Sequence, residues 1–150
     1  MVIGEMIVAD YVLGEYSYAV DNKGRVIIPP KFRDFLGESF IITKGLDGCL
    51  FVFPKNEWQL FEKKLMELPL ADRDARMFTR FFFAGAAECT LDKQGRVMLP
   101  AVLRQFADLQ KTAVVVGVTN RIEIWDEAKW QSCTDIDATD FADRMAALGI

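Results

Sequence analysis

A nine-residue stretch occurs twice in this chain, and it limits the possible folds more than any other feature of the sequence. The first copy runs from Asp21 to Pro29 and the second from Asp92 to Pro100. Both read Asp-x-x-Gly-Arg-Val, then two more residues, then Pro. An aspartate that bonds nearby backbone N–H groups and a glycine that supplies a positive φ predict a tight turn. The apolar run after each arginine predicts a short strand, and each proline suits the first turn of a following helix.

The repeat continues beyond these two turns. Lys31–Phe35 matches Val102–Phe106 in order and residue type, and Leu50–Phe53 matches Ile122–Trp125. Two units indicate a duplication with a pseudo-two-fold core, because a solenoid needs about three or more repeats. At 150 residues in total, each unit alone would have a marginal core. We therefore expect the two halves to share one core.

Helices are predicted between the repeats and at the end of the chain. Apolar residues at helical spacing predict the first of them, at Trp58, Phe61 and Leu65. A second helix is predicted from Asp72 to Phe83, where the run from Phe81 to Phe83 is expected in the core or, as a second choice, at a subunit interface. A last amphipathic helix is predicted from the spacing of Phe141, Met145 and Leu148.

The charge is distributed unevenly. The formal net charge of -4 is not typical of a nucleic-acid binder. The basic residues, however, gather at and after the two turns: Lys23, Arg25, Lys31 and Arg33 in one unit, and Lys93, Arg96 and Arg104 in the other. The acids gather elsewhere, notably at Asp135, Asp137, Asp140 and Asp143. A basic edge on an acidic body can bind phosphate locally. Judged by charge alone, however, the better explanation is that these are ordinary solvated side chains of helices and turns.

Nothing in the sequence supports an enzyme, a metal centre or a cofactor. Histidine is absent, and the three cysteines are scattered with no metal-ligand spacing. Cys49 and Cys89 lie in apolar surroundings and are expected to be buried small residues in a reduced, cytoplasmic protein. Motifs for a nucleophile, a phosphate-binding glycine loop or a metal are missing. Asp21 and Asp92 are each followed by Gly-Arg, so their expected role is to form the turn and orient the arginine.

The two turns have the chemistry of a duplex DNA reader. The arginine fork can read guanine O6 and N7 in the major groove, and lysine neutralises phosphate. A β-ribbon is narrow enough to enter that groove. Aromatic residues do not alternate with the basic turns, which argues against base stacking on single strands.

The repeated motif resembles the SpoVT/AbrB class of DNA-binding modules. Two such modules, with Phe81–Glu88 between them and Asn120–Trp125 near the end, are similar to the bacterial MraZ family. The resemblance covers about Leu13 to the C-terminus. It implies a regulator of the division and cell-wall gene cluster that binds tandem short repeats upstream of its own operon as a ring-like homo-oligomer. It also implies a protein that is cytoplasmic and associated with the nucleoid.

We therefore expect an α+β fold with two repeated modules in pseudo-two-fold arrangement, forming a small β-barrel-like core with packed helices. The predicted DNA-binding residues are Lys23, Arg25, Lys93 and Arg96 at the turns, with Arg33 and Arg104 as reinforcement. Turn-forming support is assigned to Asp21, Gly24, Asp92 and Gly95. The expected partition is an extension (1–12), module 1 (13–56), a helical linker (57–83), module 2 (84–128) and a C-terminal helical segment (129–150).

Two questions stay open from the sequence. The stretch from Met1 to Val12 precedes the usual family start near Gly14, and it resembles neither a signal peptide nor a membrane span. It is expected to be an added strand, a tail or an artefact of start-site choice. The alternative function, from another class, is an oligomeric scaffold whose basic turns bind an acidic protein partner.

Overall fold

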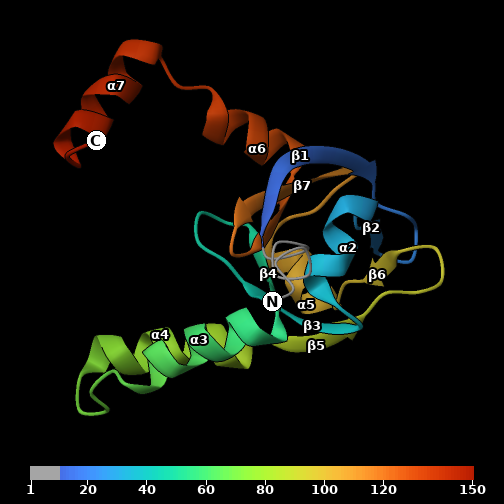
Figure 1. Ribbon diagram of the computed structural model, residues 1–150, viewed down its shortest axis with the longest axis horizontal. Coiled ribbons are helices and arrows are strands. Elements are labelled where there is room, and N and C mark those ends of the chain that lie inside the picture. Colours follow the sequence, from blue (N-terminus) through green and yellow to red (C-terminus); the bar gives the residue numbers. More distant parts are fainter. Residues whose placement is uncertain (1–10) are drawn as a thin grey trace, which may run out of the picture.

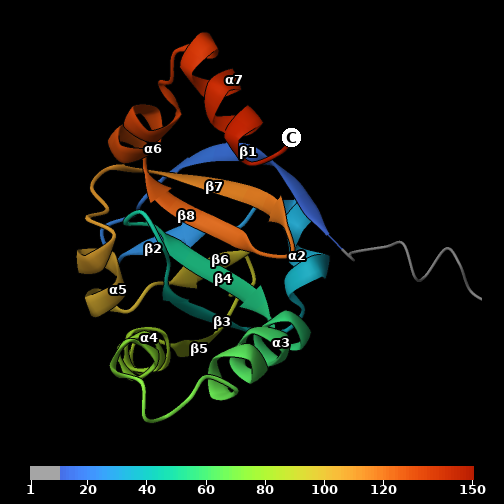
Figure 2. The same ribbon diagram turned by 90° about the vertical axis from the view of Figure 1, so that its left-hand side faces the viewer.

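An antiparallel six-stranded sheet forms the centre of the structure, a computed structural model that describes residues 11–150. The strand order across the sheet is β1-β7-β8-β4-β3-β5 (Figure 2). The strand bounds are Val12–Ala19 for β1, Thr112–Thr119 for β7, Ile122–Asp126 for β8, Leu50–Pro54 for β4, Ser39–Lys44 for β3 and Ala87–Thr90 for β5. A separate two-stranded ribbon pairs β2 (Arg25–Ile27) with β6 (Arg96–Met98).

The sheet interleaves the two sequence repeats. β1 of the first repeat pairs with β7 of the second, and β5 of the second pairs with β3 of the first. The strand order is therefore the same from either end once the strands of one repeat are exchanged for those of the other. The mixed α+β class is confirmed. A closed barrel is not, because β1 and β5 are edge strands of the sheet in the described part of the chain.

The central strands are buried on both faces, as their apolar sequences require. Alternate residues of β4 divide between two cores: Leu50 and Val52 face one, and Phe51 and Phe53 face the other. The first core lies between the sheet, the ribbon and the short helices α2 (Pro30–Leu36) and α5 (Ala101–Phe106). Each fully buried large aliphatic or aromatic side chain there contributes about 1.5–3 kcal/mol.

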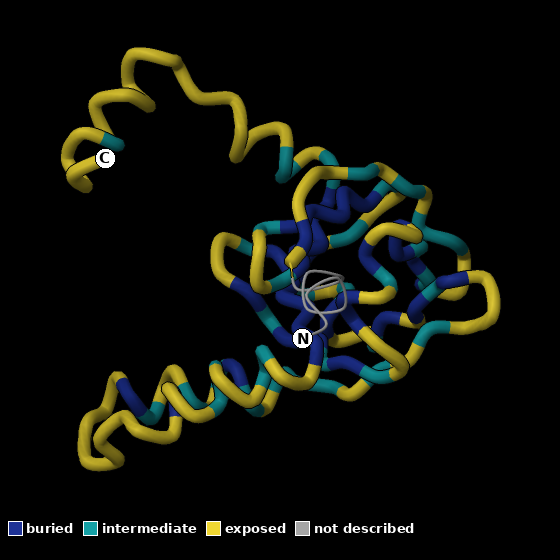
Figure 3. The backbone as a smooth tube through the Cα atoms, viewed as in Figure 1, coloured by how far each residue is buried: buried dark blue, intermediate teal, exposed yellow. Residues whose placement is uncertain are grey.

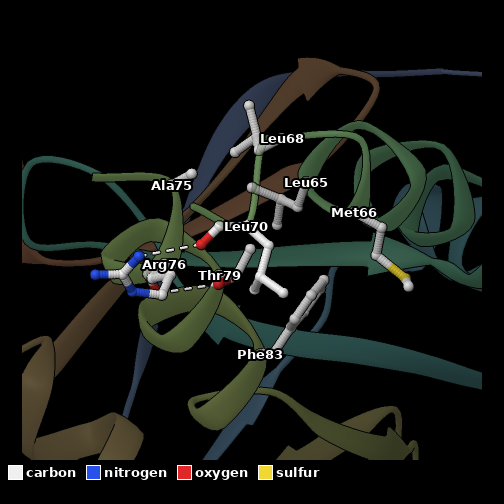
Figure 4. Close-up of a pocket in the computed structure, with 8 residues that line it drawn as sticks. All are labelled: Leu65, Met66, Leu68, Leu70, Ala75, Arg76, Thr79 and Phe83. Atoms are coloured by element: carbon white, nitrogen blue, oxygen red, sulfur yellow. Dashed lines mark hydrogen bonds between the residues drawn. The ribbon is translucent and has the colours of Figure 1, made fainter. Parts of the chain in front are cut away.

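The second core lies under a helical hairpin made of α3 (Lys55–Met66) and α4 (Arg73–Ala84). Phe82 is buried in it, and the Thr43 hydroxyl donates a hydrogen bond to the Phe82 carbonyl over 2.6 Å. Phe81 and Phe83 are half-buried against the same cluster. The core placement predicted for the phenylalanine run is thus confirmed for its middle residue. At the outer end of the hairpin, Arg76 Nη1 donates to the Leu70 carbonyl over 3.1 Å, which ties the loop to α4 (Figure 4).

Two helices end the chain: the first packs beside the sheet through Trp130, and the second extends away from it (Figure 1). Asp126 accepts a hydrogen bond from the Ala128 N–H and caps α6 (Glu127–Thr134). α7 (Ala138–Ala147) follows, and neither helix has a buried residue (Figure 3). Within residues 11–150, no helix is long and apolar enough to cross a bilayer. The predicted extension falls outside the described residues, apart from Tyr11 and from Val12, which begins β1.

Candidate nucleic-acid interface

The first turn is held together by one carboxylate. Asp21 Oδ1 accepts hydrogen bonds from the backbone N–H groups of Lys23 (2.9 Å) and Arg25 (2.8 Å). Asp21 Oδ2 accepts from Arg25 Nε over 2.6 Å, which forms an ion pair. Gly24 has φ 78°, in the left-handed region that glycine adopts without strain. The aspartate therefore shapes the turn and orients the arginine at the same time.

The second turn repeats this geometry. Asp92 Oδ1 accepts from the backbone N–H groups of Gln94 and Arg96, both over 2.9 Å. Asp92 Oδ2 accepts from Arg96 Nε over 2.7 Å, and Gly95 has φ 77°. The identical hydrogen-bond pattern means that the turn residues of both sequence copies encode one local structure.

Each aspartate occupies the Nε side of its arginine. The Arg25 and Arg96 side chains are 23% and 27% exposed, and their terminal nitrogens make no hydrogen bond to any described residue. Those nitrogens are the ones that can donate in parallel to a base edge or a phosphate. The Arg25 backbone N–H, aided by the guanidinium, lowers the pKa of Asp21, and Arg96 lowers the pKa of Asp92 in the same way. Both carboxylates are therefore charged at neutral pH.

The ribbon brings the two turns into one unit. Arg25 lies opposite Met98 and Ile27 opposite Arg96 in the antiparallel register of β2 and β6. The Leu99 N–H donates to the Gly24 carbonyl over 3.1 Å. The equivalent bond runs from the Ile28 N–H to the Gly95 carbonyl over 2.9 Å. Both turns therefore lie at one end of the molecule, opposite the α3–α4 hairpin and α7 (Figure 1).

Arg33 and Arg104 lie behind the turns and cross between the repeats. Arg104 Nε donates to the Leu99 carbonyl over 3.1 Å, and its side chain packs against Gly24 of the other repeat. A Cβ placed on Gly24 would be 2.5 Å from Arg104 Nε. Arg33 Nε donates to the Ile28 carbonyl over 2.9 Å, and its guanidinium packs against Gly95 even more closely. Each arginine thus supports the turn of the opposite repeat, and its predicted contact with DNA stays a prediction.

Lys23 and Lys93 are exposed at the tips of the turns. Neither forms an ion pair within residues 11–150, so both can approach an external phosphate. The structure therefore brings the six basic residues predicted from the sequence to one end of the molecule. Their order is two lysines at the tips, two oriented arginines behind them and two supporting arginines underneath.

The described residues contain no metal-binding cluster, and two of the three cysteines are withdrawn from solvent. No group of three or more possible metal-ligating side chains occurs in residues 11–150. Cys49 is fully buried, and burial raises the pKa of its thiol to about 12. Cys89 is half-buried against the first core, and burial raises its pKa too. Both thiols stay protonated at neutral pH, in agreement with a packing role.

The two structural repeats correspond to two matches of one family model. The model described as "MraZ protein" matches residues 11–81 and again residues 82–148. The chain belongs to the MraZ family. It is 54% identical over 140 residues to the "Transcriptional regulator MraZ" of Acetivibrio thermocellus, a match that covers 91% of this chain and 98% of that protein. Proteins of the same name from Alkaliphilus oremlandii and Clostridium tetani are each 52% identical and are covered over 99% of their length, with 92% of this chain matched.

Sequence reasoning did not find the cross-support between the MraZ repeats. The signal was present, because Arg33 and Arg104 both stand four residues after the proline of their repeat. That spacing shows that the two arginines are equivalent. It does not show that each one packs against the glycine of the other repeat, since this contact depends on how the repeats interleave.

Proposed function

We propose that this protein is a non-enzymatic, sequence-specific transcriptional regulator that binds double-stranded DNA through its two arginine-bearing turns. One observation carries the proposal: Asp21–Arg25 and Asp92–Arg96 form the same oriented ion pair twice, one at each end of a single short antiparallel ribbon. An oriented guanidinium loses less side-chain freedom when it binds than a free one does. Two of them in a fixed relation can read two positions along a groove.

The geometry favours a duplex over a single strand. Most aromatic side chains pack in the two cores, with Phe32 beside Tyr16 in the first and Phe53 beside Phe61 in the second. Exposed rings such as Phe78 and Phe141 lie on α4 and α7, not at the turns. Bases of a single strand would need exposed rings at the turns on which to stack. A basic two-stranded ribbon instead has the width that the major groove admits.

Family membership supports the regulatory role and suggests its targets. The named relatives are transcriptional regulators. We propose that this protein controls the division and cell-wall gene cluster, its own operon included. It would bind tandem short repeats in the promoter as a ring-like homo-oligomer, in the cytoplasm and in association with the nucleoid.

A gel shift with DNA from upstream of the chain's own gene, at moderate salt and with competitor DNA, tests this proposal. Arg25→Ala and Arg96→Ala should each weaken specific binding by about 1–3 kcal/mol per lost base contact. Lys63→Ala is the control, because it removes an exposed basic side chain of α3, at the end of the molecule opposite the turns (Figure 1). If both turn variants bind as tightly as the parent, the reading surface lies elsewhere.

The same experiment separates the second candidate function. Exposed Lys23 and Lys93 could also contact carboxylates on an acidic protein partner. A scaffold of that kind would shift its own upstream DNA no better than competitor DNA of random sequence. Preference for the cognate fragment would favour the regulator.

A further inference from the structure

α7 is an amphipathic helix without a partner in this structure. Phe141 and Leu148 are 49% and 80% exposed, and with Met145 they fall at the i, i+4, i+7 spacing of one helix face. Asp137 caps the helix by accepting from the N–H groups of Thr139 and Asp140 over 3.1 Å. The helix is therefore well formed while its apolar face is open to solvent.

A second open apolar surface lies on α4 and the adjoining turn between β3 and β4. Leu46, Met77 and Phe78 are 57%, 54% and 46% exposed. They border a hollow of about 220 Å³, and Phe81 and Phe82 complete its lining. Every side chain of this lining is apolar, so water gains no hydrogen-bond partner from these side chains. An apolar helix face would fill the hollow better than solvent does.

The two surfaces carry opposite charge. Residues 135–150 hold four aspartates and one arginine, whereas α4 holds three arginines and one aspartate. Arg73 and Arg80 lie on α4 one turn to either side of Met77, are exposed, and form no ion pair with a described residue. Charge complementarity of this kind favours encounter and orients the partner.

The same chain does not bring these surfaces together. α6 and α7 lie beside the β1–β7 end of the sheet, and α3 and α4 lie beside the β3–β5 end (Figures 1 and 2). No residue of α7 is fully buried within its own chain, and Met145 is the one residue of the helix that is half-buried. A second copy of the chain can supply α7 to this α4 and, in turn, present its own α4 to a third.

We propose that α7 of one copy docks its Phe141–Met145–Leu148 face onto the Leu46–Met77–Phe78 surface of the next copy. The contact joins two different surfaces, so it repeats from copy to copy and forms a ring or an open chain. This inference specifies the interface of the proposed homo-oligomer. It is independent of the DNA contacts, which lie at the opposite end of the molecule (Figure 1).

A mixing experiment tests the interface in the absence of DNA. One full-length variant carries Phe141→Ser and Met145→Ser, and the other carries Met77→Ser and Phe78→Ser. Light scattering should show that each variant alone loses the assembly of the parent. Mixed in equal amounts, they should form a 1:1 pair, since the intact α7 of the second variant meets the intact α4 of the first. The pair cannot grow further, because its remaining surfaces are both altered.

Controls make the outcome decisive. None of the four altered side chains is buried, so the circular dichroism spectrum should match the parent and show that each variant is folded. Val102→Ser, at an exposed apolar position of α5, should assemble normally, and so should Arg25→Ala with Arg96→Ala. Reversing the charges with Arg73→Glu and Arg80→Glu should weaken assembly. A monomeric parent, variants that keep the parental mass, or a mixture without a mixed species would each overturn the proposal.

Discussion

Gly24 and Gly95 are the positions at which the structure of each repeat depends directly on a side chain of the other. Each glycine has a positive φ, and each lies against an arginine from the other repeat. A side chain at Gly24 would therefore meet two separate penalties, backbone strain and collision with Arg104. The second penalty exists only because the repeats interleave.

Replacing Gly24 with alanine separates these penalties. Gly24→Ala should destabilise the fold, with the backbone strain contributing about 1–3 kcal/mol and the displaced Arg104 adding to it. The double variant Gly24→Ala with Arg104→Ala should regain the stability that was lost to the collision, while the loss due to backbone strain should remain. Denaturant unfolding of the parent, both single variants and the double variant gives the coupling directly. If the stability changes of the two single variants simply add up in the double variant, Arg104 moves aside freely.

The aspartates of the turns give stability a defined dependence on pH. Their pKa values are lowered in the folded state from the ordinary 3.8. The stabilisation is thus present above that value and is lost as the pH falls through the lowered pKa. Asp21→Asn keeps an oxygen acceptor for the backbone but removes the charge paired with Arg25. The variant should show a smaller acid-induced loss of unfolding free energy than the parent, and weaker DNA binding at neutral pH.

A denaturation series from neutral pH to below pH 3 measures this effect. Asp143→Asn is a suitable control, because its carboxylate on exposed α7 forms no ion pair with any described residue. If Asp21→Asn lost as much unfolding free energy at acid pH as the parent does, the ion pair would contribute nothing to folding.

At the scale of elements, the α3–α4 hairpin packs on the sheet through its inner turns. Phe61 of α3 stacks on Phe53 of β4, with ring centroids 5.2 Å apart, and the Phe82 carbonyl of α4 accepts from Thr43 of β3. The outer part of the hairpin is mostly exposed (Figure 3). Its apolar side chain Leu70, for example, is open to solvent. The stability of the hairpin therefore depends mainly on its inner turns.

Phe82→Ala should cost about 3–5 kcal/mol of unfolding free energy, the usual range for a buried phenylalanine. Leu60→Ala, at an exposed position of α3, should change stability by less than about 0.5 kcal/mol. Chemical denaturation of both variants provides the comparison. Equal effects at the two positions would show that the hairpin does not pack on the sheet as described.

At the scale of the whole molecule, one subunit has too few basic contacts for tight binding. Two turns that neutralise about two to four phosphates give a log–log salt slope of only about -2 to -4. The net charge of -4 adds no general attraction. Several linked subunits would each read one repeat, and after the first contact the others would bind at high effective concentration.

We therefore predict a homo-oligomer larger than a dimer, with a salt slope clearly steeper than one subunit can give. Repeats read from one face of the duplex should be spaced about one helical turn, roughly 10 bp. Shifting one repeat by about half a turn, roughly 5 bp, should sharply reduce affinity, because one subunit would then face away from its site. Binding titrations on shifted templates measure this loss. A monomer whose affinity ignores spacing would contradict the prediction.

The sequence by itself determined the local structure of this protein. Asp-x-x-Gly-Arg fixed both turns, because the hydrogen bonds of Asp21 and the positive φ of Gly24 involve only residues within four positions. The helix that begins after Pro29, the helix capped by Asp126 and the hairpin of β3 and β4 also follow from short-range patterns. The duplication itself predicted that the halves would share one core.

Only the tertiary structure decided how the halves combine. The pairing of β1 with β7, the exchange of Arg33 and Arg104 between the turns, and the open edges of the sheet depend on contacts between residues far apart in the chain. Periodicity shows which face of an element is apolar and cannot name the surface that covers it. For that reason the sequence predicted α7 as an amphipathic helix, and only the structure showed that its apolar face is left uncovered within one chain.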